Sequence, residues 1–123
     1  MDDRSRLFEE GADVEVPSQF GDDAFYRALA AQPRRRVLAH LLAREECSVE
    51  ELADVLCGWE TGEGMVPPER HKEVRIGLVH SHLPRLEAAG LAAFDPGERT
   101  VTAASLPEPV ERFLRYSVAA ERE

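Results

Sequence analysis

The chain has little lysine, little cysteine and no long apolar run. Lys72 is the only lysine beside 14 arginines, and no apolar stretch approaches the roughly 20 residues that a membrane-spanning helix needs. The acidic opening residues are followed by no apolar segment of the kind that a signal peptide carries. We therefore expect a cytoplasmic protein that does not enter a membrane.

The two cysteines match no familiar site. Cys47 and Cys57 stand too far apart to form a close ligand pair, and two cysteines cannot define a disulfide framework. His80 and His82 would lie about 200° apart around a helix, so they cannot easily share one ion. We interpret His40 as a helix-face or core histidine. The sequence therefore predicts no metal site and no cofactor.

Motifs for catalysis are also missing. The chain contains no Gly-rich phosphate loop, no nucleophile elbow and no HExxH motif. Acidic residues are abundant, but they spread along the chain as a solvated face would. We predict that the protein is not an enzyme.

What the chain has in excess is acid, with 24 Asp and Glu against 15 Lys and Arg and a net charge of -9. One interpretation is that this surface repels nucleic acid, because phosphate contacts supply most non-specific DNA affinity. The other is adaptation to very high salt, where charges are screened and acids keep a protein soluble. A wealth of Asp, Glu and Ala with almost no Lys resembles the proteins of halophilic archaea.

The first half of the chain predicts an acidic, flexible arm over residues 1–21 and three helices after it. The first helix begins after Asp22 or Asp23 and ends near Gln32. Pro33 suits the first turn of the second helix, which ends near residue 45 or 46. Ser48 and the acid three residues later form a capping box, so a third helix starts there. We expect its inward residues to be Leu52, Val55, Leu56 and Trp59.

A longer helix is predicted from the Pro67-Pro68 pair to about Ala89, with Gly90 as its C-cap. Pro84 should kink or break this helix around Ser81, because it removes the hydrogen bond to the carbonyl four residues earlier. Helical spacing predicts one buried stripe and, opposite it, an exposed face. The stripe comprises Ile76, Val79, Leu83 and Leu86, and the exposed face includes Val74, Gly77, Leu78, Ser81 and Arg85.

The last third predicts a β-hairpin and a final helix. Residues 91–94 and 99–102 flank a turn at 95–98, where Gly97 would take a positive φ. A helix then starts near Pro107 and is long enough to meet a partner. Its apolar stripe, Val110, Phe113, Leu114 and Val118, is a candidate dimerisation surface.

The predicted order of elements is typical of winged helix-turn-helix proteins. Residues 28–38 resemble the opening of regulators of the arsenic-repressor type, and residues 82–91 resemble the end of their recognition helix. From about residue 25 to 103 the chain more closely resembles a haloarchaeal winged helix family of unknown function, through Trp59-Glu60 and residues 81–84. We expect a mainly α fold with a small β-hairpin, a winged helix domain over 22–103 and a C-terminal helix over 104–123.

Basic residues fall at the places where such a domain would meet DNA. Three consecutive arginines in the first turn of a helix are disfavoured by the helix dipole, so they either contact phosphate or pair with nearby acids. The basic groups of the long helix cluster in its N-terminal half, the end that a recognition helix uses. The candidate DNA-binding residues are Arg34, Arg35, Arg36, Arg70, Lys72, Arg75, His80 and Arg99.

Two functional hypotheses follow from the sequence. In the first, the protein is a transcriptional regulator that binds double-stranded DNA as a homodimer. In the second, it is a protein-interaction module on a winged helix scaffold, with Val74 and Leu78 in the partner surface. A positive patch formed by the candidate basic residues distinguishes the first from the second.

Overall fold

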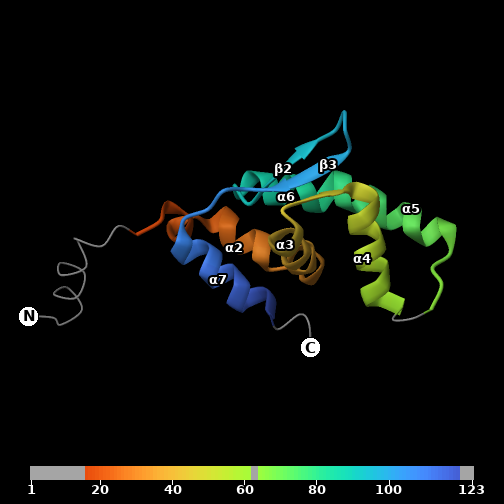
Figure 1. Cartoon of the computed structure of the whole chain (residues 1–123), viewed down its shortest axis with the longest axis horizontal. Helices are drawn as coiled ribbons and strands as arrows, with labels where there is room; N and C mark the ends of the chain where they lie inside the picture. The colour runs from red at the N-terminus through yellow and green to blue at the C-terminus, as the bar shows by residue number, and fades with distance from the viewer. Residues whose placement is uncertain (1–15, 62–63, 120–123) are drawn as a thin grey trace, which may run out of the picture.

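The structure, a computed structural model, describes residues 16–61 and 64–119. Its elements in chain order are η2 (Ser18–Gly21), α2 (Asp23–Leu29), α3 (Gln32–Arg44), β1 (Glu46–Ser48), α4 (Val49–Thr61), α5 (Pro68–Gly77), η3 (Leu78–His82), α6 (Leu83–Ala88), β2 (Ala92–Asp95), β3 (Thr100–Ala103) and α7 (Glu108–Ala119). The predicted class, mainly α with a small β-hairpin, is confirmed. Figure 1 shows the β2–β3 hairpin extending outward from the helices.

The end of the predicted N-terminal arm is part of the fold. Residues 1–15 of that arm lie outside the described residues. Residues 18–21 form a 3₁₀ helix, and the Phe20 ring meets Phe25 edge-on with 6.0 Å between ring centroids. Residues 18–21, which the prediction assigned to the arm, therefore form a short helix that packs on α2.

Local capping explains where α2, α3 and α4 begin. The Asp22 side chain accepts a hydrogen bond from the Ala24 N–H at 2.9 Å, and Pro33 occupies the first turn of α3, both as predicted. Ser48 Oγ accepts a hydrogen bond from the Glu51 N–H at 3.0 Å at the start of α4. Glu45, with φ of 69°, ends α3 in the left-handed region.

The predicted long helix contains a π turn, which reverses two burial predictions. Pro84 has no N–H to donate, and the Leu83 N–H donates instead to the Leu78 carbonyl, five residues earlier. The extra residue rotates the preceding helix by about 100° relative to a regular α-helix. Leu78 is consequently fully buried, whereas Ile76 is 49% exposed. Both assignments are the opposite of the prediction, and Val74 is only half-buried.

The sheet has β3 at its centre, with β1 and β2 antiparallel on either side. The sequence predicted the hairpin but missed β1, which has only three residues. In the turn, Asp95 Oδ1 accepts hydrogen bonds from the N–H groups of Gly97 and Glu98 at 2.9 and 3.1 Å. The positive φ expected at Gly97 occurs at Arg99 instead, with a value of 57°.

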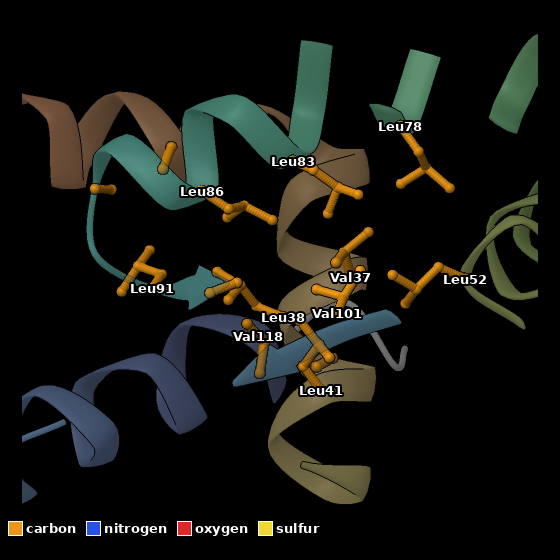
Figure 2. Packing of buried hydrophobic residues seen from close by; sticks show 14 of the residues in the cluster. Val37, Leu38, Leu41, Leu52, Leu78, Leu83, Leu86, Leu91, Val101 and Val118 are labelled. Atoms are coloured by element: carbon orange, nitrogen blue, oxygen red, sulfur yellow. The ribbon is translucent and has the colours of Figure 1, made fainter. Parts of the chain in front are cut away.

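The core is shared by the helices, the sheet and α7. In Figure 2, Val37, Leu38 and Leu41 follow one another along α3, with Leu83 and Leu86 above them and Val118 beside Leu38. The α7 residues Val110, Leu114 and Val118 belong to this same buried cluster. Each such side chain contributes roughly 1.5–3 kcal/mol on burial. α7 is thus packed into the same core as the other helices.

This packing corrects the predicted dimerisation stripe. Val110 and Leu114 are fully buried and Val118 is 5% exposed, because α7 packs on α3 of its own chain. Among the four predicted residues, Phe113 alone is substantially exposed, at 38%. It also contacts Phe20 and Phe25. The stripe therefore serves folding within one chain.

Within the described ranges, no helix combines the length and the apolar character that crossing a bilayer requires.

Candidate nucleic-acid interface

A shallow hollow lies where the α5–η3 segment meets the β2–β3 turn. It has a volume of about 240 Å³ and is lined by Lys72, Arg75, Ile76, Val79, His80 and Arg99. Four of these residues are basic and two are apolar. The structure therefore brings together four of the eight candidate DNA-binding residues.

Helix geometry places the hollow's lining on one side of α5. Residues 72, 75, 76 and 79 follow the spacing i, i+3, i+4 and i+7, which puts their side chains on one face. The rotation introduced by the π turn turns Ile76 outward onto this face. Lys72 and His80 are exposed, and Arg75 is half-buried. The helical spacing of apolar residues in the sequence predicts a buried Ile76, and that prediction is wrong.

Arg99 reaches the hollow from the hairpin and is held by an acid that the sequence did not single out. Its Nη2 donates to Glu50 Oε2 at 2.8 Å, and Arg75 Nη1 lies 3.9 Å from the same oxygen. The hydrogen bond from Arg99 is the main cause that lowers the pKa of the Glu50 carboxyl. Glu50 therefore stays ionised and joins the two arginines through one carboxylate.

Arg75 keeps unused hydrogen-bonding capacity beside the hollow. Its Nε is buried, and among the described residues no acceptor lies within hydrogen-bond distance of it. Its ion pair with Glu50 is long, at 3.9 Å. A guanidinium has five N–H donors, so this side chain is far from saturated by protein contacts.

Arg70 lies outside the hollow and is paired with acidic residues. Its Nε donates to Glu60 Oε2 at 2.9 Å, and its Nη1 lies 3.4 Å from Glu73 Oε1. The hydrogen bond from Arg70 lowers the pKa of Glu60, and the same contact raises the pKa of Arg70. This candidate stays on a neighbouring face, paired with two acids.

Arg34 and Arg35 hold the C-terminus of α2. Arg34 Nε donates to the Ala28 carbonyl at 2.8 Å and Nη2 to the Arg27 carbonyl at 3.1 Å, while Arg35 Nη1 donates to the Leu29 carbonyl at 2.7 Å. These carbonyls belong to the last turn of α2, where backbone N–H donors run out, and the Arg27 carbonyl also accepts the Ala30 N–H, at 3.1 Å. The arginines supply the further donors and so offset the unfavourable dipole at the start of α3. Arg34 is only 9% exposed. The phosphate contact predicted for Arg34 is therefore withdrawn, because its guanidinium faces the interior and donates to carbonyls of α2.

Arg36 and Trp59 form a further contact away from the hollow. The Arg36 guanidinium carbon lies 4.4 Å from the centre of the Trp59 ring, a cation–π distance. Trp59 is 37% exposed rather than turned into the core as expected. This pair joins α3 to α4 on the surface.

The structure also gathers a second cluster, which the sequence did not predict. The ligand atoms of His40, Cys47 and Glu51 all lie within 4.8 Å of one another. Burial is the main cause that raises the pKa of the Cys47 thiol to about 11, followed by the charge of Glu51. Cys57 is buried outside this cluster, and His82 instead places Nδ1 3.3 Å from Arg34 Nη1.

These features define a small, mainly helical protein with a three-stranded antiparallel sheet and a basic surface hollow beside its hairpin. Residues 26–102 match the family described as Domain of unknown function (DUF7344), and the chain belongs to that family. The match spans nearly the same residues as the resemblance to a family of unknown function seen in the sequence. Comparisons with curated proteins and with solved structures find no match.

Proposed function

We propose that the protein is a winged helix-turn-helix transcriptional regulator of a halophilic archaeon, which binds double-stranded DNA with α5 and η3 in the major groove. The observation that carries this proposal is the hollow in which Lys72, Arg75, His80 and Arg99 converge. Basic groups on one exposed helix face beside a hairpin are the arrangement expected of a recognition helix and its wing.

The chemistry of the hollow suits base and phosphate contacts together. Lys72 lies near the N-terminal half of α5 and supplies a mobile charge for a phosphate. Arg75 has a half-exposed guanidinium, held at Nη1 only by the 3.9 Å ion pair with Glu50, and is suited to the acceptor pair on guanine. The exposed Ile76 is suited to the methyl group of thymine. Arg99 at the hairpin would contact the backbone beside the same groove.

The alternative hypothesis, a protein-interaction module, is weakened because the residues of its predicted partner surface are not exposed. That hypothesis needed Val74 and Leu78 exposed on the long helix, but Leu78 is fully buried and Val74 is half-buried. The exposed apolar residue of this segment is Ile76, which lies among basic side chains. This surrounding charge favours an anionic partner.

The acidic balance of the chain shapes the expected salt dependence. With a net charge of -9, the whole molecule repels DNA at low ionic strength. Concentrated salt screens that repulsion while it also weakens phosphate contacts, so the two effects oppose each other. We expect affinity to fall less steeply with salt than is usual, and a steep loss between 0.5 and 2 M KCl would refute this expectation.

A homodimer remains part of the proposal, but with a different surface of α7. Tyr116 is 77% exposed and shares a surface depression with Pro109 and the outer edge of Phe113. Tyr116→Asp tests this face without touching the core, whereas Phe113→Asp would disturb contacts with Phe20 and Phe25. We expect sedimentation analysis to give a folded monomer for Tyr116→Asp, and an unchanged dimer would exclude this face.

The proposed DNA contact is tested by fluorescence anisotropy with genomic DNA fragments in 1–3 M KCl. The variant Lys72→Ala/Arg75→Ala should abolish specific binding, because both residues line the hollow. Arg115→Ala is the matched control, since Arg115 is an exposed arginine paired with Glu111 on α7 and lies outside both the hollow and the proposed dimer face. Binding by the parent that survives in the double variant, or that is lost equally in the control, would contradict the proposed interface. No binding of the parent to any fragment would contradict the function itself.

A further inference from the structure

Three side chains from three different elements meet beside the N-terminus of α4. His40 comes from α3, Cys47 from β1 and Glu51 from the first turn of α4. Their ligand atoms lie within 4.8 Å of one another, and His40 Nε2 is 2.5 Å from Glu51 Oε2. We propose that His40, Cys47 and Glu51 bind a divalent transition-metal ion of the zinc type, with water as its fourth ligand.

The donor set selects the class of ion. One imidazole nitrogen, one thiolate sulfur and one carboxylate oxygen are the three ligand types that zinc accepts. Magnesium and calcium are bound by oxygen ligands, so a site with sulfur and nitrogen donors does not suit them. A thiolate with an imidazole favours zinc and its borderline neighbours among the first-row metals.

Burial in the cluster is graded, as an ion site with an open position requires. Cys47 is only 6% exposed, whereas the side chains of His40 and Glu51 are 22% and 30% exposed. The ion and a water ligand can therefore approach from the side of His40 and Glu51, while the sulfur closes the inner side.

Small side-chain movements would convert the cluster into a tetrahedral site. Bond lengths of about 2.0–2.3 Å place neighbouring ligand atoms roughly 3.3–3.6 Å apart. His40 and Glu51 would separate by roughly 1 Å, and the wider distances in the cluster would close by a similar amount. The backbone can remain in place because the Ser48 cap fixes the start of α4, and Cys47 pairs with Val101 in the sheet.

Arg44 is the group that competes with the ion. Its Nη1 lies 3.1 Å from Glu51 Oε2, and its side chain is 56% exposed. Glu46 acts in the opposite sense, because its charge is felt at Cys47 and favours a cation there. Replacing Arg44 by glutamine should therefore tighten metal binding several-fold.

The direct test is a cobalt titration of the full chain in a non-thiol reductant. Co²⁺ takes zinc sites and reports a bound thiolate through a sulfur-to-metal charge-transfer band. We expect this band with the parent protein, its displacement by Zn²⁺, and its loss in Cys47→Ser. Cys57→Ser is the matched control, because Cys57 is the other buried free cysteine and lies outside the cluster.

Metal-dependent thermal stability gives a second readout that does not rely on an absorption band. Zn²⁺ should raise the Tm of the parent and of Cys57→Ser but not that of Cys47→Ser. If Cys47→Ser fails to fold by circular dichroism, His40→Gln decides, since it alters a partly exposed side chain. A missing cobalt band in the parent, or a band that persists in folded Cys47→Ser or His40→Gln, would overturn the site. This experiment uses no DNA and stands apart from the proposed function.

Discussion

The π turn before Pro84 makes a quantitative prediction about two neighbouring residues of the same helix. Leu78 is fully buried, so Leu78→Ala removes apolar packing and leaves a cavity, at a cost of about 2–5 kcal/mol. Ile76 is 49% exposed, and Ile76→Ala should cost about 1 kcal/mol or less, partly because alanine has the better helix propensity. The two substitutions should thus differ clearly in the free energy of unfolding.

Urea denaturation at fixed KCl concentration, followed by circular dichroism, measures this difference. For a domain of this size the slope is roughly 1–3 kcal/mol/M, so with a slope of about 2 kcal/mol/M Leu78→Ala should lower the midpoint by about 1–2.5 M. Leu83→Ala is the control, because Leu83 is buried in both the predicted and the observed helix phase. If Ile76→Ala destabilises as much as Leu78→Ala, the π turn is absent and the basic hollow is built from the wrong face.

Three further predictions concern single residues. Glu50→Gln should strengthen DNA binding several-fold in anisotropy measurements, because it removes a negative charge from between Arg75 and Arg99; weaker binding would contradict the assigned interface. Ser48→Ala should lower the free energy of unfolding by about 1 kcal/mol in urea titrations through loss of the α4 cap, and an unchanged midpoint would contradict that role. Burial, then the charges of Arg34 and Arg85, lowers the pKa of His82, so the fold favours the neutral ring. The resulting stability is present above its ordinary pKa of about 6.5 and is lost as pH falls below it. Melting curves between pH 7 and 5 should therefore show a smaller loss for His82→Gln than for the parent; an equal loss would refute this assignment.

Local signals in the sequence predicted most of the elements. Asp22 and Ser48 act through hydrogen bonds to residues two and three positions away, so their neighbours in the chain are enough to identify them as caps. Gly90 follows the end of α6 with a φ of 72°, a backbone conformation that residues with a side chain rarely adopt. Each signal depends on backbone chemistry within one turn, which is why it can be read without knowing the tertiary structure.

The site depends on contacts that local patterns do not contain. The single extra residue in the π turn of η3 rotates all side chains of the preceding helix about its axis. A regular helical spacing that includes Leu83 therefore predicts the wrong burial for Ile76. Glu50 joins Arg99 across 49 positions of sequence. The cluster of His40, Cys47 and Glu51 needs β1, a strand too short to leave an alternating pattern.

The acidic residues of the chain act on a bound anion in two ways, either by direct contact with a basic side chain or from a distance. In molar salt the Debye length is about 3 Å, so the repulsion between DNA and a distant acid is screened almost completely. A charge in direct contact is screened far less, and the Glu50 carboxylate lies 2.8 Å from Arg99. Under those conditions we expect the proposed affinity of the hollow for DNA to depend on Glu50 rather than on the net charge of -9. Neutralising Glu50 should therefore retain its effect at 2 M KCl, whereas neutralising Glu111 on α7, outside the hollow and the proposed dimer face, should matter only at low salt.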